Sequence, residues 1–194
     1  LYLIISGVAE FNLRSILFNI ISILTGTGYV NAEFDTWGSF TLILFLGLMF
    51  IGGCAGSTAC GIKIFRLQML FLFLKNQIKK LISPNSIILT KYNNQKISDE
   101  FINSVIVFIF SFLFIFLIIA MLLSISGLDF LTSISGAASA ISNVGPGLGE
   151  VIGPNGNYKA IPDLSKWILS IGMLLGRLEL FAVLVLFFPS FWRN

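Results

Sequence analysis

The sequence predicts an all-α membrane protein built from two similar units. Of its residues 56% are hydrophobic and only 11% are charged, and the mean hydropathy is +0.95, values outside the usual range of soluble domains. The segment Phe101–Leu123 contains no charged residue. At about 1.5 Å per residue it is long enough to cross a hydrocarbon core of about 30 Å. Glycine-rich turns divide much of the remaining apolar sequence.

Two further hydrophobic segments are long enough to span the bilayer, but each carries an interruption. Leu164–Phe188 contains Arg177 and Glu179 near its middle. Trp37–Leu74 is broken by the run GGCAGSTACG at Gly52–Gly61. We therefore expect a broken inner helix over 37–82 and a last inner helix over 164–188, in addition to the helix at 101–123.

Basic residues predict the orientation of these helices. One window contains no acidic residue before Asp99 and holds the basic residues Lys63, Arg66, Lys75, Lys79, Lys80, Lys91 and Lys96. The positive-inside rule places this window in the cytoplasm. The broken helix then runs inward, the helix at 101–123 outward and the last helix inward. These charges either set the topology alone or also dock an acidic cytosolic partner.

The order of the segments repeats along the chain. Phe11–Leu24 is an apolar helix too short to span, and the turn TGTGYV follows it. Leu128–Ser142 is a second short helix, with Asp129 as its expected N-cap, and NVGPGLG follows it. The units are residues 1–82 and 101–194, joined by a cytoplasmic loop at 83–100. The first unit opens with only a stub of its outward helix, LYLIISG, without Met or the features of a signal peptide. We interpret the sequence as a piece of a longer protein.

The two glycine turns are expected to be re-entrant loops. Irregular backbone at membrane depth is tolerated only where it is buried in protein or lines a water-filled path. A half-helix entering from outside directs its C-terminal carbonyls, the negative end of its dipole, toward the membrane centre. Glycine lets the following carbonyl oxygens turn toward an axis and replace the hydration shell of a cation. The turns centred on Gly28 and Gly145 are therefore candidate cation filters. The alternative for Gly145–Gly149 is an ordinary extracellular loop.

Four motifs resemble, in order, successive motifs of the Trk/Ktr/HKT superfamily of potassium transporters: TGTGY, GGCAGSTACGIK, SNVGPGLGEVIGP and LLGRLELF. The likeness runs from about Phe11 to the C-terminus and is greatest to the membrane subunit of bacterial Trk potassium-uptake systems. It implies four potassium-channel-like units in one chain, each with a helix, a re-entrant pore half-helix, a filter loop and a second helix. This sequence would hold the third and fourth units.

The resemblance also implies a function and partners. The function would be potassium uptake across the bacterial cytoplasmic (inner) membrane, with potassium as the substrate, no bound cofactor and no enzymatic activity. The complete membrane subunit would be a homodimer in the lipid bilayer. It would bind a cytosolic nucleotide-binding regulatory subunit and no nucleic acid.

By this resemblance, backbone carbonyls of two loops face the potassium ion. The first filter loop is Thr25, Gly26, Thr27, Gly28 and Tyr29. The second, within the filter segment 142–148, is Ser142, Asn143, Val144, Gly145 and Pro146.

The resemblance further implies that the small-residue break is an intramembrane gate loop, which lies below the filter and blocks ion flow until it moves. Its residues are Gly52, Gly53, Cys54, Ala55, Gly56, Ser57, Thr58, Ala59, Cys60 and Gly61, followed by Lys63. The family usually has a second glycine where this chain has Cys60, and a side chain there would restrict the loop. The alternative role of the run is close helix packing.

Arg177 is the residue most costly to place in the bilayer. An arginine near the middle of a spanning helix costs about 2.5 to 3.5 kcal/mol on insertion scales. Glu179, two positions on, lies on another helix face and is badly placed to pair with it. The resemblance implies that Arg177 points toward the gate loop, donates to loop carbonyls and opposes cation passage in the closed state. The alternative is a structural pair with another helix. Gly172 and Gly176 form a GxxxG pattern that we attribute to packing.

Several other chemistries are disfavoured. The chain has no histidine, the usual general base and zinc ligand. Cys54 and Cys60 form neither a CxxC pair nor a disulfide framework, and GPGLG is not the GxGxxG of a nucleotide fold. Acids expected near the outer face could concentrate cations: Glu33, Asp35, Glu150 and Asp163. The main alternative function is a broken-helix secondary transporter that binds another cation or a small solute at the midplane.

Overall fold

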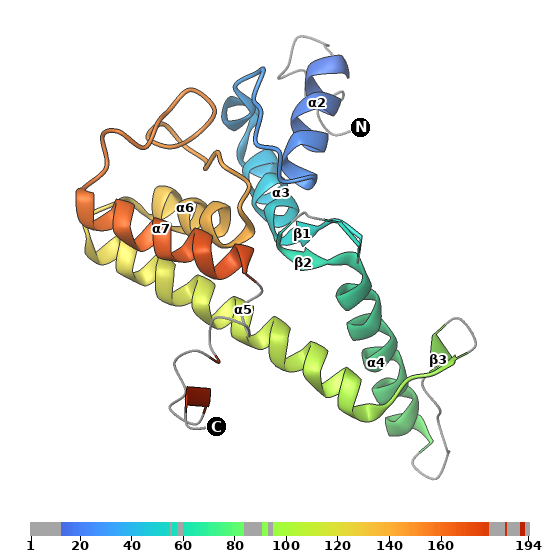
Figure 1. Ribbon diagram of the computed structural model, residues 1–194. Helices are drawn as coiled ribbons and strands as arrows, with labels where there is room; N and C mark the ends of the chain where they lie inside the picture. The colour runs from blue at the N-terminus through green and yellow to red at the C-terminus, as the bar shows by residue number, and fades with distance from the viewer. Residues whose placement is uncertain are drawn as a thin grey trace.

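The computed structural model shows a predominantly helical chain (Figure 1). The structure describes residues 13–54, 56–57, 60–83, 91–92, 95–178, 185 and 191–192. The predicted stub at the N-terminus, part of the gate loop (Ala55, Thr58 and Ala59) and the predicted inner helix beyond Leu178 lie outside the described residues, apart from Val185.

The helical elements are α2 (Leu13–Leu24), the 3₁₀ helix η1 (Phe34–Trp37), α3 (Ser39–Phe50), α4 (Ile64–Ile82), α5 (Asp99–Ile125), α6 (Phe130–Ser142) and α7 (Asp163–Arg177). Two pairs of very short strands accompany them: β1 (Ile51–Gly52) with β2 (Ile62–Lys63), and β3 (Lys91–Tyr92) with β4 (Gln95–Lys96). The all-α prediction missed both pairs, because two-residue strands have no recognisable hydrophobic period.

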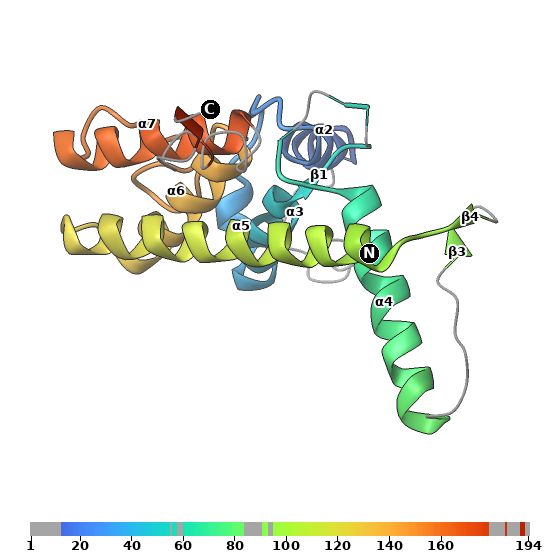
Figure 2. The same cartoon turned by 60° about the horizontal axis from the view of Figure 1, so that its bottom comes forward.

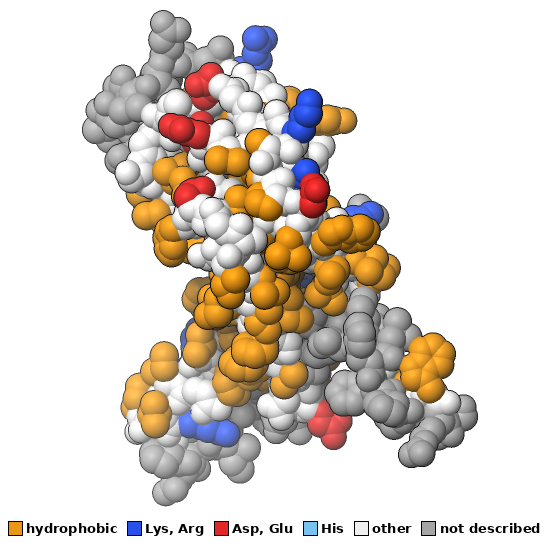
Figure 3. Space-filling model, turned by 90° about the vertical axis from the view of Figure 1, so that its left-hand side faces the viewer, with side chains coloured by type: hydrophobic (Ala, Val, Ile, Leu, Met, Phe, Trp, Pro, Cys, Tyr) orange, Lys and Arg blue, Asp and Glu red, His pale blue; other side chains and the backbone are white. Residues whose placement is uncertain are grey.

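Helix α5 is the long support of the fold. The segment Glu100–Ile125 is long and apolar enough to cross a membrane, and among the described residues it is the one helix that is. Its N-terminus is capped by Ser98, whose Oγ accepts a hydrogen bond from the amide of Phe101 (3.3 Å). Helices α6 and α7 lie side by side along one half of α5, whereas α4 meets its other end (Figures 1 and 2). In Figure 3, hydrophobic side chains gather around the middle of the face shown.

The predicted break in the first inner helix is present. Helix α3 ends at Phe50 and α4 begins at Ile64. Strands β1 and β2 pair in parallel at the base of the intervening loop, with Ile51 opposite Ile62. A Cβ atom at Gly52 would collide with the carbonyl oxygen of Cys60. The small residue at Gly52 therefore lets the two ends of the gate loop approach closely.

A shared hydrophobic core joins the two predicted units. It is made of Ile23, Phe34, Trp37, Phe45 and Met49 from the first unit and Ala138, Val144 and Leu148 from the second. The rings of Phe34 and Phe45 stack with their centroids 4.5 Å apart. Burial of these side chains holds η1 and α3 against α6 and the loop that follows it.

Helix α6 begins at Phe130, two residues after the predicted start at Leu128, and is almost entirely buried. Asp129 is its N-cap, with Oδ2 accepting a hydrogen bond from the amide of Thr132 (3.1 Å), which confirms the predicted cap. Helix α6 packs against α5, α7 and α3. Its alanines and Gly136 let these neighbours come close, as small residues do between membrane helices.

The GxxxG pair on α7 faces α6. A Cβ atom at Gly172 would lie 3.3 Å from the Cβ of Ala140 and 3.0 Å from Cδ1 of Ile119. A Cβ atom at Gly176 would overlap the carbonyl oxygen of Ile141. Both positions thus serve close packing, in agreement with the interpretation from the sequence.

We expect Gly176→Ala to destabilise the complete protein by roughly 1 to 3 kcal/mol, because the new methyl group collides with backbone that cannot move alone. Thermal unfolding in detergent would measure it. The matched control is Gly47→Ala on α3, where an added Cβ meets nothing within 4 Å. That change should be neutral or stabilising by up to about 1 kcal/mol. Equal unfolding temperatures for the two variants would contradict the close approach of α7 to α6.

Candidate functional site

The two half-helices α2 and α6 end in loops with the same backbone hydrogen bonds. In each loop, two amides that follow the helix turn back and donate to carbonyls of its last turn. The bonds are Gly26 to Ile23 (3.1 Å) and Thr27 to Ser22 (2.9 Å) in the first loop, and Asn143 to Ala140 (3.2 Å) and Val144 to Ser139 (3.0 Å) in the second. The loops are therefore structural equivalents.

The backbone dihedrals of the two loops also correspond. The φ angles of Gly26 and Gly28 are +67° and +77°, and those of Asn143 and Gly145 are +52° and +112°. Positive φ at both positions favours glycine, and asparagine is among the few other residues that tolerate it. The Nδ2 of Asn143 donates to the carbonyl of Met173 on α7 (3.0 Å), which ties this conformation to the inner helix.

The structure brings the two predicted filter loops together. A Cβ atom at Gly28 would collide with the carbonyl oxygen of Val144. A Cβ atom at Gly145 would lie 3.7 Å from the Cα of Gly28, and one at Gly26 would lie 3.7 Å from the carbonyl oxygen of Asn143. Loops that are far apart in the sequence thus meet backbone to backbone.

Hydroxyl groups lie beside these backbones. The Oγ1 atoms of Thr25 and Thr27 are 2.8 Å apart, and both residues are exposed. Ser142, the counterpart of Thr25, is 2% exposed. Among the described residues its hydroxyl has no hydrogen-bond partner. Carbonyl and hydroxyl oxygens are ligands suited to a hard cation.

Three residues that the sequence analysis did not single out support the second loop. Ser139 Oγ accepts from the amide of Gly145 (3.1 Å), and the hydroxyl of Tyr158 donates to the carbonyl of Gly145 (2.8 Å). Ser135 Oγ accepts from the amide of Leu148 (2.9 Å). Serines four positions apart in an apolar half-helix were the available signal for Ser135 and Ser139. Tyr158 carries no such signal.

The gate loop is closed at its base and bonded internally. Besides the β1–β2 pair, the amide of Ile64 donates to the carbonyl of Gly53 (3.2 Å) and the amide of Ser57 to that of Cys54 (2.9 Å). Cys60 is half-buried, and Cys54 is exposed. Lys63 is half-buried at the end of β2, directly before α4.

Arg177 reaches the gate loop. Its Nη1 donates to Sγ of Cys60 over 3.5 Å. The side chain therefore points toward the gate loop, as predicted. The acceptor in this contact is a thiol, which is weaker than the carbonyl that we expected. Helix α7 is described as far as Arg177, with Leu178 as its C-cap. Glu179 lies outside the described residues.

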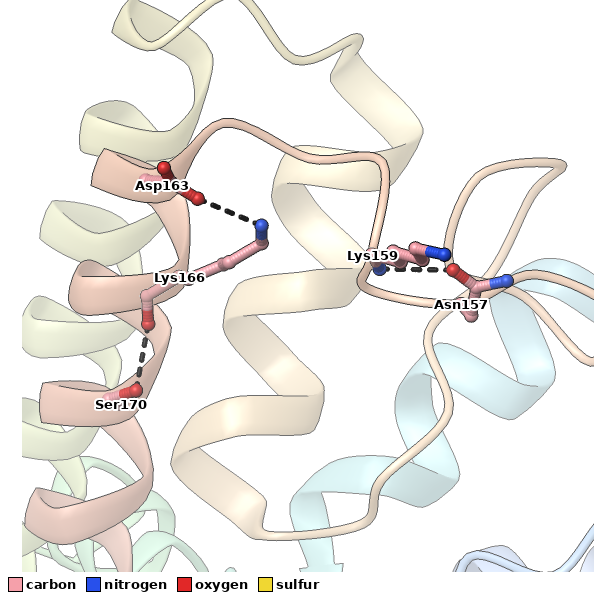
Figure 4. A network of polar contacts seen from close by, with 5 residues as sticks. All are labelled: Asn157, Lys159, Asp163, Lys166 and Ser170. Atoms are coloured by element: carbon pink, nitrogen blue, oxygen red, sulfur yellow. Dashed lines mark hydrogen bonds and ion pairs between the residues drawn. The ribbon is translucent and has the colours of Figure 1, made fainter.

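Three of the predicted outer acids, Glu33, Asp35 and Glu150, interact through their charges, whereas Asp163 pairs with a lysine. Asp163, at the start of α7, pairs with Lys166, whose Nζ lies 2.9 Å from Oδ1, and Lys166 in turn accepts from Ser170 through its carbonyl (2.8 Å) (Figure 4). Asp35 lies instead beside Gly153, where an added Cβ would be 2.9 Å from its Oδ2. Partial burial raises the pKa of Asp35, and the charges of Glu33 and Glu150 raise it further.

Two half-helices that end in equivalent loops, beside one long apolar helix, are the features to set against known proteins. Residues 8–194 match the TrkH family, described as "Cation transport protein". The chain belongs to the TrkH family.

Named relatives agree with this assignment. The chain is 46% identical over 183 residues to the Trk system potassium uptake protein TrkI of Halomonas elongata, and covers 37% of that protein with 94% of its own length. It is 35% identical over 187 residues to the Trk system potassium uptake protein TrkH of Escherichia coli, covering 38% of it with 96% of its own length. The crystal structure of the potassium transporter TrkH from Vibrio parahaemolyticus superposes with a TM-score of 0.84 at 35% identity. That superposition covers 92% of this chain and 38% of the other. The chain therefore spans well under half the length of these relatives.

The raised pKa of Asp35 predicts a pH-dependent stability. A carboxyl whose folded-state pKa is raised is penalised when ionised, so its contribution lowers stability as pH rises from about 4 through the folded-state pKa. We expect Asp35→Asn to raise the unfolding temperature of the complete protein at pH 7, and the gain to vanish below about pH 4. Asp163→Asn is the control, because Lys166 lowers the pKa of Asp163 and its loss should have the opposite sign. A gain at pH 7 from Asp163→Asn but not from Asp35→Asn would contradict this assignment.

Proposed function

We propose that the complete protein takes up potassium across the bacterial cytoplasmic membrane through a filter of backbone carbonyls, and that this chain supplies two of the filter loops. The observation that carries the proposal is the meeting of two equivalent loops, at Gly28 and Gly145. Membership of the TrkH family and the names of the relatives support potassium as the ion. The two units would be the third and fourth of four.

Electrostatics favours a cation at this place. Helices α2 and α6 both end at the loops, and the loops meet each other, so the negative ends of the two helix dipoles lie close together. An anionic solute would instead require helix N-termini, as in broken-helix secondary transporters. Backbone oxygens that replace part of the hydration shell discriminate among cations by their number and field strength.

The loop between α3 and α4 would act as the gate. It is bonded at its base and contacts Arg177 through Cys60. A guanidinium in the ion path repels a cation, and its contact with the loop favours the closed position. Opening would then move Arg177 and the loop away from the path together.

The cytoplasmic end of α4 would bind the regulatory partner. Lys75, Lys79 and Lys80 are exposed on this helix, which projects away from the α5–α7 bundle (Figure 2). Such a group of positive charges suits an acidic surface on a soluble nucleotide-binding subunit. The complete protein would be a homodimer.

The filter proposal predicts that Gly145→Ser weakens discrimination between potassium and sodium. A side chain at φ +112° strains the turn and redirects its carbonyl. Reversal potentials of the complete protein in mixed potassium and sodium would measure the permeability ratio. The control is Gly127→Ser, at φ +92° in the turn between α5 and α6, which carries similar strain outside the filter. An unchanged ratio for Gly145→Ser, or an equal loss for Gly127→Ser, would sink the proposal.

The gate proposal predicts that Arg177→Ala raises potassium flux per folded molecule in proteoliposomes. Cys60→Ala should act in the same direction more weakly, and the double variant should add little to Arg177→Ala, because both release one barrier. Lys166→Ala is the control, since it removes a positive charge from the other end of α7. Loss of folded protein with unchanged flux per molecule would instead identify Arg177 as part of a structural pair.

A further inference from the structure

The segment after the second filter loop returns to that loop through Tyr158. Its phenol hydroxyl donates to the carbonyl oxygen of Gly145 over 2.8 Å. The ring is half-buried and packs against the hydrophobic cluster that includes Ile152, Ile161 and Leu169. The backbone of the segment is bonded to itself, for example from the amide of Asn157 to the carbonyl of Val151 (3.0 Å). The hydroxyl therefore reaches Gly145 from a fixed position.

Side chains hold both polar groups of Gly145. Ser139 Oγ, on α6, accepts from the amide of Gly145 (3.1 Å), while Tyr158 donates to its carbonyl. The Ser139 hydroxyl lowers the pKa of Tyr158, but burial outweighs this contribution. Burial raises the pKa of Tyr158 above its usual value near 10. The phenol consequently keeps its proton and can donate at any physiological pH.

The first filter loop is built differently. The amide of Gly28 lies 3.4 Å from the backbone carbonyl of Ser22. Within the described part of the chain, the hydroxyl of Ser22 has no partner, and no side chain bonds the carbonyl of Gly28. Tyr29 is 70% exposed. The support by a tyrosine hydroxyl thus distinguishes the second loop from its structural equivalent.

The geometry points to Tyr158 as a positioning residue of the filter, which orients the Gly145 carbonyl and occupies one of its two acceptor sites. This inference rests on the proposed function. A carbonyl oxygen has two lone pairs, so Gly145 can accept from Tyr158 and still face an ion. The donated hydrogen bond fixes the direction of the carbonyl dipole and reduces the charge that it offers to the ion. Both properties enter the balance between potassium and sodium.

The test is Tyr158→Phe in the complete protein, which removes the hydroxyl and keeps the packed ring. We expect the permeability ratio of potassium over sodium to fall roughly three- to ten-fold, the effect of losing one hydrogen bond. Tyr92→Phe is the matched control. It removes the hydroxyl of Tyr92, which lies in the β3–β4 hairpin and bonds Gln68 of α4 (3.1 Å). This site is away from the filter, so the permeability ratio should be unchanged.

A purely structural Tyr158 would give less folded protein with an unchanged ratio per molecule, and this result would overturn the inference, as would an increased ratio. If Tyr158→Phe yields no folded protein, Tyr158→Leu is measured in its place with the same expectation. Gly145→Ser distinguishes a failure of the role of Tyr158 from a failure of the filter assignment. A changed ratio for Gly145→Ser with an unchanged ratio for Tyr158→Phe refutes only the role of Tyr158. Unchanged ratios for both refute the filter itself.

Discussion

A helix that ends inside a membrane leaves carbonyl oxygens without partners, and the rest of this fold follows from that constraint. In the proposed arrangement, helices α2 and α6 both end in this way. Two carbonyls of each last turn accept from amides that turn back: those of Ser22 and Ile23 in α2, and those of Ser139 and Ala140 in α6. The oxygens that remain can be satisfied by water or a cation. These remaining carbonyl oxygens therefore form a candidate binding site for an ion.

Helix packing determines where these oxygens lie. Helix α6 is buried among α3, α5 and α7, and the small residues Gly172 and Gly176 let α7 come close to its last turn. The shared hydrophobic core, which includes Ile23 and Leu148, holds the two loops close to each other. Because packed interiors deform little, the positions of the loop carbonyls depend on side chains that lie outside the proposed ion path.

The broken inner helix meets the same constraint by another route. Where α3 ends, the backbone pairs with itself through β1 and β2 instead of presenting its carbonyls to an ion. A loop that satisfies its own base can change position without exposing many polar groups. Such a segment would suit the proposed gate, whereas the second loop, held by Ser139, Tyr158 and Asn143, would suit a rigid site.

The sequence by itself determined the features that depend on local pattern. Hydropathy located α5, apolar length located the half-helices, glycine spacing located both loops and the break, and Asp129 marked the start of α6. The tertiary structure alone decided which distant groups meet: Tyr158 with Gly145, Arg177 with Cys60, and Asn143 with Met173. It also decided the pairing of β1 with β2, which two-residue strands do not signal. The physical reason is that hydropathy and turn chemistry act between neighbours in the sequence, whereas these contacts depend on the packing of all the helices at once.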